Sequence, residues 1–117
     1  MTPAHADSLF DECIEACEEA LHACQACAAH DIRDASPGMA QCSLINLDCA
    51  DACAATLSAL ARHSDHHGDF CALCAHLCRV CSEECGKHDH EHCRKCKEAC
   101  DRCAAACAKH ASEKHAA

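Results

Sequence analysis

Cysteine recurs at helical intervals near the C-terminal end of the chain. The cysteines between Cys93 and Cys107 are separated by steps of three, four, three and four residues. Such steps place every one of them on a single face of an α-helix, at positions that leucine usually takes in a packed helix. The cysteines from Cys71 to Cys85 repeat the same steps. A helix whose buried face is lined with thiols is suited to hold soft metal ions.

The composition places these thiols inside the protein. The chain has 117 residues and 17 cysteines, but only two Phe and neither Trp nor Tyr. Half of the residues count as hydrophobic, yet most of these are Ala and Cys. Without the cysteines the core would be too small for a domain of this size, and cysteine is among the residues most often buried. We therefore expect residues 1–117 to form one domain with a cysteine-lined core.

The same periodicity predicts four helices, over about residues 8–30, 37–63, 66–86 and 89–112. The predicted boundaries carry residues typical of caps and breaks, namely Asp7 or Ser8, the linker Asp31–Ala35, the pair Ser36–Pro37, the turn Ser64–Gly68, and Gly86. Because the linkers are short, neighbouring helices must be antiparallel. The sequence thus predicts an all-α fold, an antiparallel up-down-up-down four-helix bundle.

The first two predicted helices continue the buried stripe with fewer cysteines. The stripe of the first helix is Phe10, Cys13, Cys17, Ala20, Cys24 and Cys27, and that of the second is Met39, Cys42, Asn46, Cys49, Cys53, Thr56 and Leu60. The second helix thus carries only three cysteines, with Asn46 on the stripe.

The net charge and the lack of targeting signals limit the partners and the compartment that we expect for this protein. The net charge is −9 and there is no basic stripe, so we expect no nucleic-acid partner. The first residues lack the basic and apolar regions of a signal peptide, and no run in the sequence approaches a membrane span, so we expect a cytoplasmic protein without a membrane partner. In that reducing compartment a cysteine-rich chain is more often metal-binding or catalytic than disulfide-bonded.

Several kinds of cysteine chemistry fit the spacing poorly. Residues four apart on a helix have Cβ atoms ~5–6 Å apart, whereas a disulfide needs ~3.5–4.5 Å. A thioredoxin-like enzyme uses one exposed C-x-x-C at a helix N-terminus, but this chain has five such pairs, mostly inside helices. An iron–sulfur cluster remains physically possible, although the ferredoxin spacing and its proline are absent. No Ser/His/Asp set, phosphate loop or isolated acid–base pair points to an enzyme.

A zinc finger is also excluded by the predicted helix. Cys93, Cys96, His110 and His115 nearly match the finger spacing. A finger, however, needs a β-turn between its cysteine pair and its helix, and the residues from Lys97 to Ala106 predict continuous helix. A structural zinc site also closes with four ligands, which 17 thiols exceed several times.

Cu(I) fits the pattern best. It is a soft ion that prefers thiolate and accepts two or three sulfur ligands, so neighbouring thiolates can be shared along a line with roughly one ion per cysteine. Cu(I) also replaces a thiol proton with an equal charge, so we expect the metal-free protein to fold. The predicted ligands are all the cysteines: Cys13, Cys17, Cys24, Cys27, Cys42, Cys49, Cys53, Cys71, Cys74, Cys78, Cys81, Cys85, Cys93, Cys96, Cys100, Cys103 and Cys107.

From Ser8 to His110 the chain resembles the cytosolic copper storage proteins. The shared features are Cys-x-x-x-Cys repeats on all four helices, the missing export signal and the histidine-rich start of the fourth helix. The resemblance implies storage of multiple Cu(I) ions inside each bundle, protection against copper toxicity, and a homotetramer. Asn46 departs from the pattern and indicates either reduced capacity or a weak oxygen ligand. A metallothionein-like buffer for zinc or cadmium remains the alternative.

The two ends of the predicted bundle differ. The Met39 end, formed by the ends of helices one and three and the starts of two and four, holds soft and borderline ligands. The Phe10 end, at the opposite side, is closed by bulky groups: Phe10, Leu57, Leu60, His63, His67, Phe70 and His110. We predict that copper enters at the Met39 end, with His88 and His92 as metal ligands, as the resemblance also implies. Whether Met39, His90 or His110 binds metal stays open, and we expect packing or capping roles for His63, His67 and His110.

Overall fold

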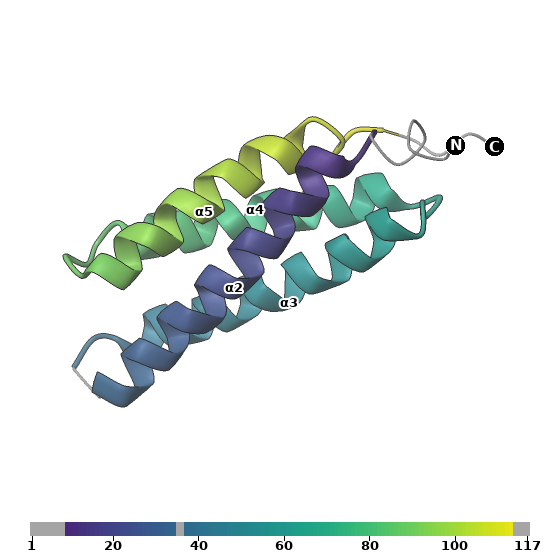
Figure 1. Ribbon diagram of the computed structural model, residues 1–117. Helices are drawn as coiled ribbons and strands as arrows, with labels where there is room; N and C mark the ends of the chain where they lie inside the picture. Colours follow the sequence, from purple (N-terminus) through teal and green to yellow (C-terminus); the bar gives the residue numbers. More distant parts are fainter. Residues whose placement is uncertain (1–8, 35–36, 114–117) are drawn as a thin grey trace.

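The protein is described by a computed structural model in which residues 9–34 and 37–113 are placed. It contains four helices and, within those residues, no strand. They are α2 (Asp11–Asp34), α3 (Ala40–Ala61), α4 (His67–Cys85) and α5 (Glu91–Ala108). Each helix packs mainly against two others: α2 and α4 both lie between α3 and α5. The predicted all-α antiparallel four-helix bundle is confirmed (Figure 1).

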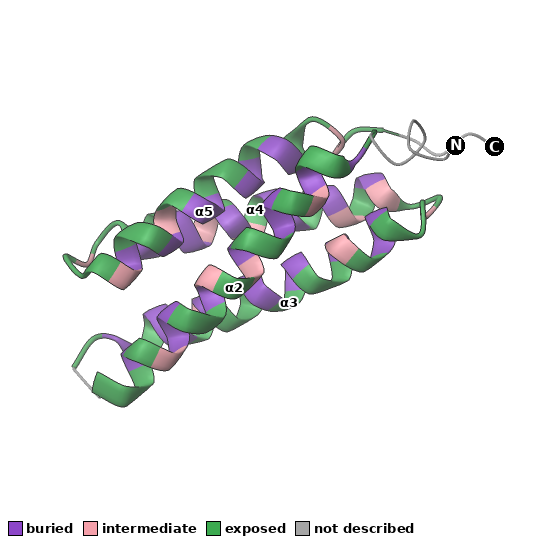
Figure 2. Cartoon of the chain, in the orientation of Figure 1, coloured by how far each residue is buried: buried purple, intermediate pink, exposed green. Residues whose placement is uncertain are grey.

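The buried stripes are those that the sequence predicts. Every cysteine is at most 1% exposed, and the non-cysteine members Phe10, Ala20, Met39, Asn46, Thr56 and Leu60 are buried as well. In Figure 2 the buried positions follow the inward faces of the helices, and the exposed ones the outer faces. Helical spacing alone therefore selects which residues enter the core.

The boundary between α2 and α3 differs from the prediction. The helix does not stop at His30 but continues through the expected linker to Asp34, because Asp31 is one further step on the buried stripe and is 2% exposed. Pro37 is not the first helical residue, since Gly38 has φ +87° and α3 begins only at Ala40. Ser36, the predicted cap, and Asp7 and Ser8 lie outside the described residues.

The other ends differ by one to four residues. Gly86 follows α4 as predicted, although with φ −65° it is not in the left-handed conformation typical of a glycine stop. The fourth helix ends at Ala108, after which successive turns bring Glu113 N to within 3.0 Å of His110 O. These turns bring Glu113 to His67 at the Phe10 end.

One helix qualifies as a membrane span by length and composition, contrary to the expectation from the sequence. The 22 residues of α3 include an 18-residue window of mean hydropathy 1.3, of which 44% is buried. Core helices of soluble proteins meet the same criterion. In this protein the apolar content of α3 includes Cys42, Cys49 and Cys53, which face the other three helices.

Candidate metal centre

The thiols meet along the axis of the bundle. All 17 cysteines are free and buried. Each helix supplies them at steps of three, four or seven residues, which keep them on one face, so the side chains converge from four directions at successive levels. The deep burial of so many thiols with few other polar groups means that their hydrogen-bond partners are mainly one another.

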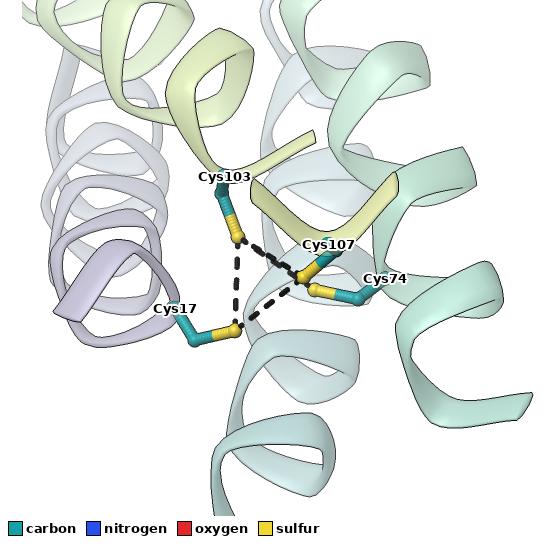
Figure 3. A group of neighbouring side chains, drawn as sticks. All are labelled: Cys17, Cys74, Cys103 and Cys107. Carbon is teal, nitrogen blue, oxygen red and sulfur yellow. Dashed lines mark hydrogen bonds between the residues drawn. The ribbon is translucent and has the colours of Figure 1, made fainter. Parts of the chain in front are cut away.

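Sulfur-to-sulfur contacts connect these levels. Cys13 Sγ lies 3.2 Å from Cys107 Sγ, and Cys103 donates to Cys17 Sγ over 3.8 Å. Figure 3 shows one level, where Cys17, Cys74, Cys103 and Cys107 from α2, α4 and α5 point toward a common centre. The contacts continue along the axis at 3.6–3.9 Å through Cys74–Cys53, Cys53–Cys78, Cys78–Cys49, Cys49–Cys100 and Cys100–Cys24.

Several of these levels have the dimensions of a metal site. Ligand atoms within 4.8 Å of one another occur in the groups Cys17/Cys74/Cys103/Cys107, Cys24/Cys81/Cys96/Cys100, Cys53/Cys74/Cys78/Cys103, Cys27/Asp31/Cys42/Cys93 and Cys13/Cys71/Cys107. Sulfurs bound at ~2.3 Å to one metal are ~3.8–4.6 Å apart, depending on coordination number. Cys74, Cys103 and Cys107 each belong to two of these five groups, so a sulfur can bridge neighbouring ions.

Burial and hydrogen bonding set the protonation of the thiols. Loss of hydration raises the pKa of Cys42 and of Cys93 above its ordinary value. Deeper in the core, a hydrogen bond from Cys107 lowers the pKa of Cys13, whereas hydrogen bonds with Cys103 and Cys13 raise the pKa of Cys107. Hydrogen bonding among neighbouring thiols therefore shifts their pKa values in opposite directions.

Asn46 accepts hydrogen bonds from the thiols around it. Its Oδ1 atom accepts from Cys81 at 3.1 Å and from Cys85 and Cys96 at 3.6 Å. Its Nδ2 atom donates to Asp31 Oδ2 at 3.4 Å and to Cys42 Sγ at 3.7 Å. Asn46 thus connects the inner thiols to the group at the Met39 end, and its amide oxygen occupies a position among three sulfurs.

The Met39 end carries a mixed group of donors. His92 Nδ1 lies 3.3 Å from Cys27 Sγ, 3.6 Å from Cys93 Sγ and 3.7 Å from Asp31 Oδ1. Asp31 Oδ1 and His92 Nε2 are buried and have no hydrogen-bond partner among the described residues. A buried polar atom without a partner carries a desolvation cost that a bound cation or proton can offset. The end therefore offers sulfur, nitrogen and carboxylate ligands around one point.

A cavity opens beside this group. It has a volume of about 330 Å³ between α2 and α5, and Cys27, His30 and His92 contribute to its lining. The His92 ring stacks on His30 on one side, at 4.8 Å between centroids, and His90 stands 5.3 Å away in a parallel orientation. His92 thus lies between the exposed surface at this end and the thiol of Cys27.

The other residues named at the Met39 end occupy different positions. His88 Nε2 lies 2.9 Å from Glu84 Oε2, so its partner is a carboxylate. That hydrogen bond lowers the pKa of Glu84. Met39 is buried before α3, where its carbonyl accepts from Ser43 N. His90 is exposed at the start of α5.

Aromatic side chains close the Phe10 end. The Phe10 ring lies 5.3, 4.9 and 5.1 Å from the rings of His63, His67 and His110. His67 Nε2 and His110 Nδ1 both contact Glu113 Oε1, at 2.7 and 3.0 Å. The packing role expected for the three histidines thus corresponds to contacts with one buried phenylalanine.

Two carboxylates were missed in the sequence. Asp31 lies four residues after Cys27, so continuing the three-and-four spacing would have found it. Glu113 follows the last helix and meets His67, 46 residues away, for which no periodic signal exists. Both groups are placed by tertiary contacts.

Comparison with known proteins gives a consistent result. The family model described as copper storage protein matches residues 6–112. The chain is 38% identical over 81 residues to the uncharacterized cysteine-rich protein YhjQ of Bacillus subtilis (strain 168), covering 68% of this chain and 75% of that protein.

Solved structures agree with the family match. The Cu(I)-bound copper storage protein BsCsp3 superposes with a TM-score of 0.84 at 38% identity, covering 88% of this chain and 98% of that one. A cytosolic copper storage protein from Streptomyces lividans, in a structure with five coppers, superposes with a TM-score of 0.83 at 34% identity, covering 92% and 95%. With its cysteine-lined four-helix bundle, the chain belongs to the copper storage protein family.

Proposed function

We propose that this protein stores multiple Cu(I) ions as a line of thiolate-bridged sites along the bundle axis, in the cytosol, and has no catalytic activity. Stored copper is thereby kept from harmful chemistry and held for later use. The observation that carries the proposal is the unbroken series of sulfur contacts from Cys13 to Cys24, at 3.2–4.0 Å. The two solved relatives described above contain copper.

Charge favours Cu(I) over zinc. Four thiolates around Zn²⁺ leave two negative charges, and the buried residues among those described include no Lys or Arg to balance them. Burying an unbalanced charge is costly. One Cu(I) per thiolate leaves the core neutral at any load. A zinc or cadmium buffer would also require about four thiols per ion.

The proposed ligands are the 17 cysteines together with His92. His92 is already in contact with Cys27 and Cys93, so it can pass an incoming ion to them. His88 serves as a ligand only after it leaves Glu84. We propose that copper enters through the Met39 end, past His92 and Asp31.

Anaerobic titration of the reduced protein with Cu(I), with copper counted per chain, tests the proposal. The expected result is saturation near one ion per cysteine, roughly fifteen or more, without visible absorption. Saturation at about four ions, with zinc competing equally, would support the zinc buffer. A brown protein would indicate an iron–sulfur carrier.

We also propose a homotetramer, as the family resemblance implies. Exposed leucines on the outer faces, Leu44 at 60%, Leu47 at 42% and Leu73 at 49%, support an interface. Light scattering of the wild type and of Leu44→Glu tests this. A wild type that is monomeric at micromolar concentration contradicts it.

A further inference from the structure

The Phe10 end gathers a second set of metal-ligating atoms that contains no sulfur. Glu113 Oε1 lies 2.7 Å from His67 Nε2 and 3.0 Å from His110 Nδ1. His67 belongs to the start of α4, and the other two to the turns after α5. The side chains of His67 and His110 are only 12% and 17% exposed, and that of Glu113 is 44% exposed. One carboxylate oxygen thus faces two largely buried imidazole nitrogens.

The contact made by Nδ1 of His67 bears on whether its other ring nitrogen, Nε2, is free to bind a metal ion. Nδ1 lies 3.3 Å from Ser64 O, and a carbonyl oxygen only accepts, so this contact is a hydrogen bond in the tautomer that carries its hydrogen on Nδ1. In a neutral ring Nε2 then presents a lone pair to the Glu113 carboxylate. The 2.7 Å between Nε2 and Glu113 Oε1 is then bridged by a hydrogen on Nε2 or by a metal ion that takes its place. A backbone carbonyl on the far nitrogen is the arrangement usual for metal-bound histidine.

The ligand set is held in place before any ion binds. Phe10 contacts both imidazole rings at 4.9 and 5.1 Å between centroids, which restricts their rotation. Gly68 lies directly under the turn that carries Glu113, because a Cβ at this position would clash with the main-chain oxygen of Glu113.

We propose that His67, His110 and Glu113 form a site for one borderline divalent ion such as Zn²⁺, separate from the thiolate core. Two imidazoles and one carboxylate are a donor set that zinc accepts, with water as the fourth ligand. Cu(I) prefers the sulfurs of the core. Ligand atoms at ~2.0–2.2 Å from zinc are ~3.4 Å apart, so the two contacts must widen by about half an ångström.

Such an ion would fasten the chain after α5 to the start of α4 and hold the histidines against Phe10. The bundle would then be closed at this end while the Met39 end exchanges copper. The inference goes beyond copper storage, because it assigns a different metal to a different donor set.

Zinc binding to the copper-loaded protein tests the proposal. Filling the thiols with Cu(I) first removes them as competitors; Zn²⁺ is then added, unbound metal is removed on a desalting column, and zinc is counted per chain. We expect one zinc in the wild type and a loss of affinity of about tenfold or more in Glu113→Gln. The matched control is His76→Ala, which removes an exposed imidazole from α4 and should keep its zinc.

A second variant and a second readout make the test independent of copper loading. Gly68→Ala keeps all three ligands but displaces Glu113, so zinc affinity should again fall. The ¹⁵N resonances of the His67 and His110 rings should shift with Zn²⁺ in the wild type and not in Glu113→Gln. Equal zinc content in Glu113→Gln and His76→Ala, or ring resonances indifferent to zinc, would overturn the site and leave only an ion pair between His67 and Glu113.

Discussion

Replacing Asp31 by Asn should stabilise the metal-free protein while impairing copper uptake. The Asp31 side chain has no exposed surface, and its Oδ1 atom has no hydrogen-bond partner. Its Oδ2 atom accepts two weak hydrogen bonds, from Asn46 Nδ2 at 3.4 Å and from Cys27 Sγ at 4.0 Å. The imidazole of His92 lies beside it, with Nδ1 3.7 Å from Asp31 Oδ1, beyond hydrogen-bond distance.

The size of the effect follows from these contacts. A buried acceptor left without a partner costs about 1–3 kcal/mol, and more when charged. Asparagine has the same shape, keeps an oxygen for Asn46 and puts an N–H₂ donor near the sulfurs of Cys27 and Cys93. We therefore expect the free energy of unfolding to rise by about 1–3 kcal/mol in Asp31→Asn, which for a chain of this length raises Tm by about 4–12 °C.

Thermal unfolding of reduced, metal-free protein, followed by far-UV circular dichroism, measures this difference. Asp34→Asn is the matched control, because Asp34 is exposed on the same helix and should leave Tm unchanged. In Asp31→Asn the first equivalents of Cu(I) should also bind more slowly than in the wild type, because this variant lacks the anionic ligand at the Met39 end. A lower Tm in Asp31→Asn would refute the reasoning and show that the ion pair with His92 outweighs the unpartnered oxygen.

Three further perturbations follow from contacts described above. His92→Ala should slow Cu(I) loading and removal by about tenfold or more, and should lower the copper capacity by no more than one ion. Stopped-flow measurements check this, with His22→Ala, which removes an exposed imidazole, as the control. Equal rates in the two variants would exclude His92 from the entry route. Leu60→Ala should lower the free energy of unfolding by about 2–5 kcal/mol, because Leu60 has no exposed surface. The control Leu73→Ala should change the same quantity, measured by urea unfolding, by no more than about 0.5 kcal/mol. Similar losses in the two variants would mean that the core repacks around the smaller side chain. The hydrogen bond from His88 lowers the pKa of Glu84 below its ordinary value of 4.5, so Glu84 contributes stability that is present above pH 4.5 and lost as pH falls through the folded value. The difference in Tm between the wild type and Glu84→Gln should therefore shrink as the pH falls below 4.5. A difference that stays constant with pH would contradict this.

The periodic part of the fold was predictable because it depends on local geometry. A three-and-four spacing of cysteines places Cys71, Cys74 and Cys78 on one helix face whatever surrounds them, and the structure buries all three. The same rule places Asn46 and Thr56 in the core despite their polarity. Where the side-chain sequence repeats, the element and its buried face follow from it.

What was not predictable depends on contacts between distant residues. Asp31 is polar and follows a histidine, so the local sequence predicts a linker there, but hydrogen bonds from Asn46 and Cys27 hold it in the core. The start of α3 was placed at Pro37 although Gly38 takes a left-handed conformation. The pairing of His67 with Glu113 joins two segments that no local pattern connects. His92 was predicted among the ligands, but its stacking on His30 was not.

The hydrogen-bonded thiols make the core an ion exchanger. Each Cu(I) that enters displaces a proton from an S–H group, so the core holds protons when empty and copper when full, at the same total charge. Apparent copper affinity should therefore fall by about tenfold per site for each pH unit of acidification below the thiol pKa. A local drop in pH at the Met39 end would release copper without unfolding the bundle. The buffering capacity of the protein would measure how many of its thiols hold copper.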